Sequence, residues 1–305
     1  MNTALTGVVP PVLTPLDAAG NLDLRSLEAL VTRLLEAGVD GLFALGSSSE
    51  TVFMDPARRL QILDAILDMV AGQVPVLAGV IDTQVGAMRP LLEEVSRRPV
   101  AGVVATAPFY AITGPVEVDE HFRQVAALSA VPVWAYDIPV CTHYKISPEA
   151  LMALAEDRVI VGVKDSSGDD VSFRRLARFN AASGSGLSLL TGHEVVVDGA
   201  YLAGGHGAVP GLANVDPGGY VRMHRAALAG DWETVRREQD RLAGIFEIVF
   251  SVRDRVGPAQ GIGAFKTALQ QLGVFATNAM HPPLTPLTEQ HRPAIRELLE
   301  AYDVR

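Results

Sequence analysis

The sequence lacks the features of a secreted or membrane protein. A single cysteine, Cys141, excludes an internal disulfide and is typical of a reducing cytoplasm. No window approaches the roughly 18 consecutive apolar residues that a membrane helix needs. The first residues have no basic stretch followed by an apolar core, so no signal peptide is visible. We therefore expect a soluble cytoplasmic protein.

Positive charge is also in short supply. Among 305 residues, 25 Lys+Arg stand against 35 Asp+Glu, which gives a formal net charge of −10. The arginines are interspersed, whereas nucleic-acid-binding proteins usually carry a concentrated basic face. The hydrophobic content of 49% is ample for a packed core. The composition predicts a globular protein with neither a nucleic-acid nor a membrane partner.

Lysine is the scarcest cation, with Lys145, Lys164 and Lys266 as the only three. Lys164 ends a short apolar run bounded by polar residues, which is typical of a strand buried on both faces. A lysine at this position suggests a task that needs a deprotonatable amine, which a guanidinium group cannot perform. The alternative is a structural ion pair with Asp165 or another nearby carboxylate.

Short apolar runs recur along the chain, and each is followed by a segment with helical periodicity. Their spacing of roughly 20 to 35 residues is the interval of βα units. Eight such units predict an α/β fold, a (β/α)8 TIM barrel. An open doubly wound sheet is the alternative, but no G-x-G-x-x-G follows the first run. The predicted strands are Val8–Leu13, Gly41–Leu45, Val74–Val80, Ala101–Ala105, Val131–Tyr136, Val159–Lys164, Leu187–Leu190 and Gly207–Val209.

After about residue 215 the pattern contains helices without intervening strands. We therefore expect a barrel domain over residues 1–228 that carries the active site, and a small C-terminal helical domain over residues 229–305. The expected helices of this part are Gly219–Ala229, which closes the barrel, and then Trp232–Phe250, Gly261–Gln271 and Glu289–Tyr302.

Polar residues at the ends of the predicted strands indicate the chemistry, because barrel active sites lie at the carboxyl ends of the strands. An amine in an apolar barrel mouth stays partly neutral and nucleophilic. Tyr136 lies one strand before Lys164 and could transfer protons. The loop Gly46–Ser49 offers hydroxyls and backbone N–H groups for a carboxylate. The amine, the phenol and this loop together suit a 2-oxo acid as substrate. The alternative is that they are ordinary polar residues at the ends of strands.

Three motifs occur at these strand ends: Gly46-Ser47-Ser48-Ser49-Glu50, then Tyr136-Asp137-Ile138-Pro139, then Gly162-Val163-Lys164-Asp165-Ser166-Ser167-Gly168. In this order they are similar to the G-x-x-G-E, Y-N-I-P and G-x-K-[DE]-x-[ST]-G segments of one family. The chain resembles the dihydrodipicolinate synthase / N-acetylneuraminate lyase family of pyruvate-dependent class I aldolases nearly end to end.

The resemblance implies a lyase in which Lys164 forms a Schiff base with pyruvate or a 2-oxo acid and Tyr136 donates and accepts protons. It implies that Ser48 and neighbouring N–H groups hold the carboxylate, and that Ser47 relays protons to Tyr110, which the adjacent subunit contributes. Val209 falls where the family's backbone contacts pyruvate. The family's tetramers, built as pairs of dimers, imply a homo-oligomer. Neither a cofactor beyond the lysine imine nor a metal is expected.

Three departures from the family pattern concern the loop and the substrate. Ser49 replaces a glycine, which could strain the loop if that position needs a left-handed backbone. Asp137 replaces the asparagine of Y-N-I-P. Cys141 stands where dihydrodipicolinate synthases have an arginine that binds the aldehyde's carboxylate, and a thiol cannot supply that cationic fork. The last change favours another 2-oxo acid, although a protonated His143 could take the arginine's place.

Several strand-end residues keep two interpretations. Glu194 is either a contact for distal substrate hydroxyls or an acid in the first turn of a helix, and His193 beside it is similarly ambiguous. Gly192 and Gly211 are substrate-loop candidates, but without a nearby arginine or lysine they do not favour a phosphorylated substrate. Structural roles are expected for three further residues. Glu50 should organise the loop that begins at Gly46, Asp165 should form the turn after Lys164, and His206 should lie at the far end of the barrel.

The sequence therefore predicts a Schiff-base-forming aldolase or lyase acting on pyruvate or a 2-keto-3-deoxy acid. One alternative is a 4-hydroxy-tetrahydrodipicolinate synthase, which condenses pyruvate with aspartate semialdehyde. Another is a non-catalytic 2-oxo-acid binding protein that has kept the barrel. A zinc-dependent class II aldolase is not favoured, because the seven histidines form no H-x-H or H-E-x-x-H pattern.

Overall fold

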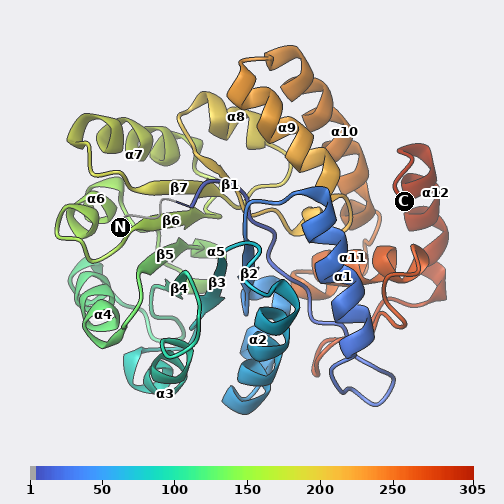
Figure 1. The fold of residues 1–305 in the computed structure, drawn as a ribbon, viewed down its shortest axis with the longest axis horizontal. Coiled ribbons are helices and arrows are strands. Elements are labelled where there is room, and N and C mark those ends of the chain that lie inside the picture. Colours follow the sequence, from blue (N-terminus) through green and yellow to red (C-terminus); the bar gives the residue numbers. More distant parts are fainter. Residues whose placement is uncertain (1–4) are drawn as a thin grey trace.

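Eight parallel strands form the centre of the molecule (Figure 1). The computed structural model describes residues 5–305. Each strand pairs with the next in sequence from β2 to β8, and β8 pairs with β1. A bridge between Pro11 and Phe43 joins the segment after β1 to β2. The strands are β1 (Gly7–Val8), β2 (Leu42–Ala44), β3 (Val76–Gly79), β4 (Gly102–Thr106), β5 (Val133–Asp137), β6 (Gly162–Asp165), β7 (Ser188–Thr191) and β8 (Gly207–Ala208).

This pairing confirms the predicted (β/α)8 barrel. The open-sheet alternative is wrong, because an open sheet would leave two unpaired edge strands and here the last pairing returns to the first strands. The sequence placed all eight strands within a few residues of their observed positions. The observed strands are shorter than predicted at several ends, since the apolar runs continue into loops that remain buried.

Helices surround the barrel on its outer face (Figure 1). The side chains of Asp23, Asp55 and Ser147 cap the first turns of α1, α2 and α6, because each accepts the N–H of the residue three positions later. The helices are α1 (Leu24–Ala37), α2 (Pro56–Val70), α3 (Val85–Val95), α4 (Pro115–Leu128), α5 (Pro139–Thr142), α6 (Pro148–Glu156), α7 (Asp170–Ser183), α8 (Val197–Leu202) and α9 (Pro217–Ala229).

Two hydrophobic clusters fill the fold. The larger lies between the strands and the surrounding helices, and the smaller fills the inside of the barrel. Because side chains alternate across a strand, β2, β3, β4, β5 and β7 supply residues to both clusters. The inner cluster includes Phe43, Leu77, Val104, Trp134, Tyr136, Leu190 and Val209. Tyr136 thus belongs to the packed interior of the barrel.

Short helices that the sequence pattern did not predict follow three of the strands. They are η1 (Ser47–Ser49) and η2 (Thr51–Phe53) after β2, α5 after β5, and η3 (Gly211–Asn214) after β8. Segments of three or four residues are too short to show a period. All lie at the carboxyl ends of the strands, where the sequence predicted the site.

Three helices follow the barrel and lie together at one side of it, orange to red in Figure 1: α10 (Trp232–Phe250), α11 (Pro258–Gln271) and α12 (Arg292–Ala301). A short η4 (Glu289–His291) precedes α12. This confirms the predicted C-terminal helical extension. The boundary after residue 228 stays a prediction, because α10 packs against both α9 and α11.

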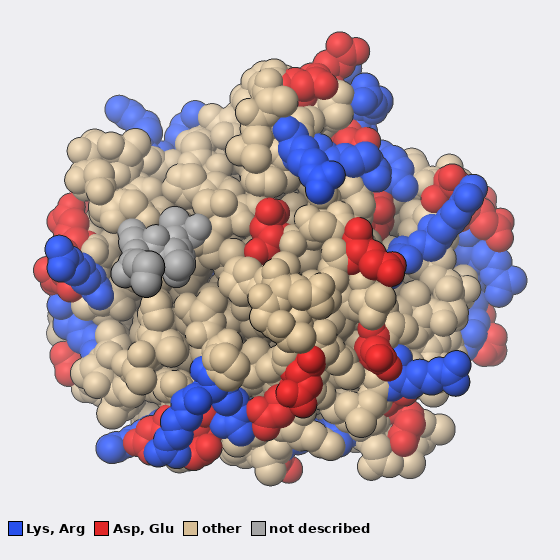
Figure 2. Space-filling view, viewed as in Figure 1, with Lys and Arg blue, Asp and Glu red and all other residues tan. Residues whose placement is uncertain are grey.

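Charged residues of both signs are mixed at the rim of the face that Figure 2 shows, and most of its centre is formed by other residues. No helix within residues 5–305 combines the length and the apolar character that crossing a membrane requires.

Candidate active site

Lys164 and Tyr136 face each other across the β5–β6 pair inside the barrel. Their Cα atoms are direct partners in the parallel register. The Nζ of Lys164 lies 4.1 Å from the centroid of the Tyr136 ring and 5.0 Å from that of Phe43. Lys164 is 6% exposed and Tyr136 is 3% exposed. An amine and a phenol are therefore adjacent in a largely apolar environment, as the sequence predicted.

Lys164 is the lysine without an anionic partner among the described residues. The amine of Lys145 forms an ion pair with Asp137, and that of Lys266 with Glu50. The carboxylate of Asp165 instead accepts the N–H of Ser167 at 2.7 Å. The structural interpretation of Lys164 as the partner of Asp165 is thus wrong, while the expected turn-forming role of Asp165 is confirmed.

The loop after β2 presents backbone donors. The 3₁₀ helix η1 closes with hydrogen bonds from the N–H of Ser49 to the Gly46 carbonyl and from the N–H of Glu50 to the Ser47 carbonyl. Within residues 5–305, the N–H groups of Ser47 and Ser48 have no hydrogen-bond acceptor. Free N–H groups at a tight turn are suited to a carboxylate. The geometry thus keeps Ser47 and Ser48 as candidates.

Ser49 does not strain this loop, contrary to the expectation from the family pattern. The left-handed residue is the next one, Glu50, with a φ of 62°. Ser49 is fully buried, and its hydroxyl donates to the Val12 carbonyl at 2.6 Å. The replacement of glycine by serine therefore adds a hydrogen bond between the loop and the segment after β1.

Left-handed backbone at non-glycine residues recurs at this end of the barrel. Leu45 and Glu50 flank η1, Tyr110 follows β4, and His143 ends α5. Such conformations are costly and are often retained at functional sites. They lie in the loops that carry the candidate residues.

Glu194 joins the loops after β7 and β8. It precedes α8, which begins at Val197, so the interpretation as an acid in the first turn of that helix is wrong. Its Oε1 accepts the N–H of Gly211 at 3.0 Å. Burial raises the pKa of Glu194, against the opposing effects of its N–H donors and the Lys164 ammonium. The carboxyl group of Glu194 thus links the loop after β7 to the loop after β8.

Gly192 and Gly211 have packing reasons to be glycine. A Cβ on Gly192 would lie 1.9 Å from the Ser166 hydroxyl, and one on Gly211 would lie 2.9 Å from both Glu194 and Phe265. A larger residue at either position would force these side chains to move. The two glycines shape the site whether or not they touch a substrate.

The remaining candidates lie at different depths. Val209 is buried in the inner cluster, and its N–H donates to the Thr191 carbonyl at 2.7 Å. Cys141 is exposed on α5, where partial burial raises the thiol pKa and the Lys164 charge opposes this. Tyr110 is 94% exposed. A single chain therefore does not enclose Tyr110, and its role across a subunit contact stays a prediction.

His206 accepts the N–H of Leu189 through Nδ1 at 3.0 Å, next to the start of β8. Its expected structural role at the far end of the barrel is therefore confirmed.

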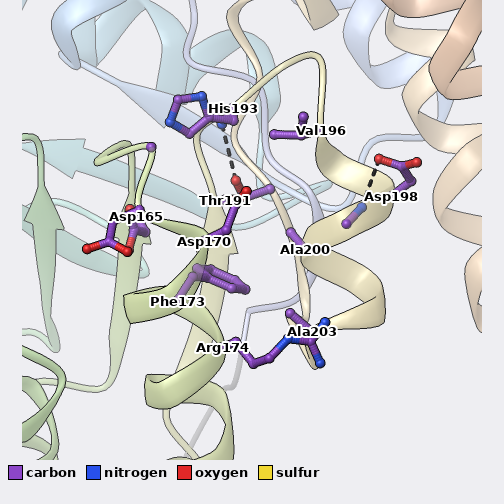
Figure 3. Close-up of a pocket in the computed structure, with 13 residues that line it drawn as sticks. Asp165, Asp170, Phe173, Arg174, Thr191, His193, Val196, Asp198, Ala200 and Ala203 are labelled. Atoms are coloured by element: carbon purple, nitrogen blue, oxygen red, sulfur yellow. Dashed lines mark hydrogen bonds between the residues drawn. The ribbon is translucent and has the colours of Figure 1, made fainter.

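His193 lies beside a cavity of about 240 Å³ between α7 and α8 (Figure 3). The backbone N–H of His193 donates to the hydroxyl of Thr191 at 3.2 Å. Phe173 and Arg174 on α7, Ala200 on α8 and Ala203 directly after α8 line the same cavity. Lys164 and Tyr136 are not among its lining residues, so this cavity lies apart from the amine and the phenol.

Sequence reasoning missed the partner of Asp137. Its carboxylate forms an ion pair with Lys145 and accepts the N–H of Ile146 at 3.2 Å. Asp137 pairs in register with Asp165, one residue beyond the Tyr136–Lys164 pair. The sequence signal was the co-occurrence of an unexpected aspartate and one of only three lysines eight positions apart. This ion pair lies immediately behind the candidate site.

We expect Asp137→Asn to change the pH dependence of folding. Burial, opposed by Lys145, raises the pKa of Asp137 from 3.8 to about 6. The unfolded chain therefore loses this proton at lower pH than the folded chain, so ionisation between those two values favours unfolding. Between pH 3.5 and pH 7, the free energy of unfolding of the wild type should therefore fall by about 3 kcal/mol more than that of the variant.

Urea unfolding of both proteins across this pH range measures the difference. Loss of the Lys145 contact in the variant adds a constant to the difference between the two free energies of unfolding. This constant does not depend on pH in the range measured. A difference that does not change with pH would contradict the raised pKa.

The sequence matches the Dihydrodipicolinate synthetase family over residues 4–302. A DapA-like lyase of Halobacterium salinarum is 33% identical over 291 residues, which cover 95% of this chain and 92% of the relative. A 4-hydroxy-tetrahydrodipicolinate synthase of Laribacter hongkongensis is 28% identical over 300 residues, covering 98% and 99% of the two chains.

Solved structures agree with this assignment. YagE, a prophage protein of the dihydrodipicolinic acid synthase family from E. coli K12 in complex with pyruvate, superposes with a TM-score of 0.92 at 27% identity, covering 98% of this chain and 99% of that one. Dihydrodipicolinate synthase from Bacteroides thetaiotaomicron also gives 0.92, at 28% identity over 99% of this chain and all of that one.

Proposed function

Because the chain belongs to the dihydrodipicolinate synthetase family and is an enzyme of the lyase class, we propose that its lysine Lys164 forms a Schiff base with pyruvate or another 2-oxo acid. The observation that carries this proposal is the unpaired amine of Lys164, buried against the ring of Tyr136. An amine that no carboxylate holds is available to attack a ketone, and Lys164 is such an amine among the described residues.

The reaction begins with attack of the Lys164 nitrogen on the ketone carbon. The carbinolamine loses water to give a protonated imine, which withdraws electrons from the neighbouring carbon. The phenol of Tyr136 supplies the proton that leaves with the hydroxyl, and its phenolate takes a proton back in the later steps. The adjacency of phenol and amine supports this assignment.

The substrate carboxylate is assigned to the loop after β2. The unpartnered N–H groups of Ser47 and Ser48 support this role, and the hydroxyl of Ser48 adds a third donor. Ser47 relays protons to Tyr110 of an adjacent subunit, so the active enzyme is a homo-oligomer, a dimer or tetramer. The 94% exposure of Tyr110 supports this arrangement.

The aldehyde-side substrate is proposed to be neutral and hydroxylated, as in a 2-keto-3-deoxy sugar acid. Cys141 offers no cation for a second carboxylate. The carboxyl group of Glu194, whose Oε1 accepts the Gly211 N–H, can also form hydrogen bonds with substrate hydroxyls. Val209, Gly192 and Gly211 complete the walls of this site.

A 4-hydroxy-tetrahydrodipicolinate synthase is the second candidate. Several relatives that cover nearly the whole chain, among them that of Laribacter hongkongensis, carry this name. Because residue 141 is a cysteine, this reaction would require a cation elsewhere for the carboxylate of aspartate semialdehyde. The exposed His143 is the nearest candidate in the sequence. A non-catalytic 2-oxo-acid binding protein would leave Lys164 and Tyr136 without a chemical task.

A substrate panel separates these possibilities. Purified enzyme is assayed for pyruvate release from 2-keto-3-deoxy sugar acids and for condensation of pyruvate with aspartate semialdehyde. We expect cleavage of at least one sugar acid and little condensation, both lost in Lys164→Ala. Efficient condensation with aspartate semialdehyde would show that Cys141 does not exclude the synthase reaction, and binding without any turnover would favour the binding protein.

A further inference from the structure

Glu50, Lys266 and His281 form a buried charged cluster, hereafter the Glu50 cluster. The side chains of Glu50 and Lys266 have 0% exposure. One carboxylate oxygen of Glu50 forms an ion pair with the Lys266 amine. The other accepts the backbone N–H of His281 at 2.7 Å and lies 3.2 Å from the Nδ1 of its ring. Both carboxylate oxygens thus have partners.

The cluster joins the loop after β2 to the C-terminal region. Lys266 lies on α11, and its amine also donates to the Ala279 carbonyl at 2.8 Å. His281 follows α11, in a segment that also contacts the start of the barrel, because the hydroxyl of Thr277 donates to the Leu16 carbonyl at 2.6 Å. The C-terminal region therefore holds Glu50 from two sides.

Glu50 in turn fixes the end of η1. Its N–H donates to the Ser47 carbonyl, and its backbone has a left-handed φ of 62°. A non-glycine residue keeps this conformation only where its surroundings impose it. Ser49 secures the same turn from the other side, through its hydrogen bond to the Val12 carbonyl. The turn with the free N–H groups is thus held between the barrel and the C-terminal helices.

Stability alone does not account for a cluster of this kind. Burying two opposite charges costs several kcal/mol per ion in desolvation, and apolar residues of similar volume often do as well or better. Burial alone would raise the pKa of Glu50, but the hydrogen bonds from His281 and the charge of Lys266 outweigh it, so the pKa is lowered. This direction fits a charged pair. A fixed charge with two directional partners gives orientation, which apolar packing does not.

We propose that Lys266 and His281 are positioning residues that act through Glu50 to aim the N–H groups of Ser47 and Ser48 at the substrate carboxylate. The C-terminal region is then part of the substrate-recognition machinery of the barrel. This inference rests on the proposed function, since it assumes that the loop binds the carboxylate of a 2-oxo acid.

The test compares two ketones that differ in the carboxylate charge. Borohydride trapping at Lys164 is measured with pyruvate and with methyl pyruvate, whose ester carries no charge. For Glu50→Gln we expect the half-saturating concentration of pyruvate to rise about tenfold or more, and the trapping rate with methyl pyruvate to stay within about twofold of wild type. General damage to the fold would instead lower trapping with both ketones.

Two further variants complete the experiment. Glu238→Gln neutralises a different ion pair, with Arg222 between α9 and α10, and should leave both ketones unaffected. The double variant Glu50→Gln/Lys266→Met leaves no unpaired buried charge, so it should fold even if the single variant does not. It should show the same weaker trapping with pyruvate and the same unchanged trapping with methyl pyruvate. An unchanged ratio of the two ketones in a folded variant overturns the inference.

The outcome also separates this inference from the proposed function. Absence of any pyruvate adduct in the wild type would refute the proposed Schiff base itself, and the positioning role with it. If the wild type forms the adduct but Glu50→Gln lowers trapping equally with pyruvate and methyl pyruvate, the proposed Schiff base stands. Only the positioning role is then refuted.

Discussion

Replacing Lys164 by methionine is expected to reduce kcat/KM for the cleaved 2-oxo acid by at least about 10³-fold. Methionine fills a similar volume among the rings of Phe43 and Tyr136, so the barrel interior should remain packed. The loss would come from the missing nucleophile, because a thioether cannot form an imine. Steady-state kinetics and thermal unfolding of the same preparation measure the two effects separately.

The matched control is Lys145→Arg. Arginine keeps a positive charge beside Asp137 and lies outside the barrel interior. We expect this variant to keep activity within a few-fold of wild type. Comparable losses in both variants would mean that the loss in Lys164→Met does not come specifically from the missing amine of Lys164.

Tyr136→Phe is expected to lower kcat by about 10² to 10³-fold, with a smaller change in KM. The ring stays in the inner cluster, where it makes an edge-to-face contact with Phe43, so only the proton-transferring hydroxyl is removed. Because the amine of Lys164 is retained, slow imine formation should still be detectable. A variant that forms the imine but turns over slowly would be the signature of a proton shuttle.

Tyr201→Phe provides the comparison for this substitution. The Tyr201 hydroxyl is hydrogen-bonded to the Nδ1 of His224 at 2.9 Å, beside a cavity next to His206. Removing that hydroxyl should change stability slightly and activity hardly at all. If Tyr136→Phe behaved in the same way, the phenol of Tyr136 would not be the proton donor.

The barrel and its central pair were predictable because their signals are local. A strand buried on both faces is a continuous apolar run, and each helix has its own period and cap. The rule that barrel sites lie at the carboxyl ends of strands then predicts from the sequence that Lys164 and Tyr136 lie together. Register pairing of the two residues confirms that step.

The supporting contacts were not predictable, because they join residues far apart in the sequence. Glu50 and His281 are separated by 231 positions, and no local pattern links them. The short turn η1 has no period, so the left-handed backbone of Glu50 was also not predictable from the sequence. The same limit applies to Glu194, whose role depended on where α8 begins.

The most direct measurement is borohydride reduction of the wild-type enzyme with pyruvate, followed by peptide mass spectrometry. We expect a stable reduced adduct of pyruvate on the peptide that contains Lys164, and none on the peptides with Lys145 or Lys266, whose amines are held in ion pairs. An unmodified Lys164, or an adduct on another lysine, would contradict this expectation.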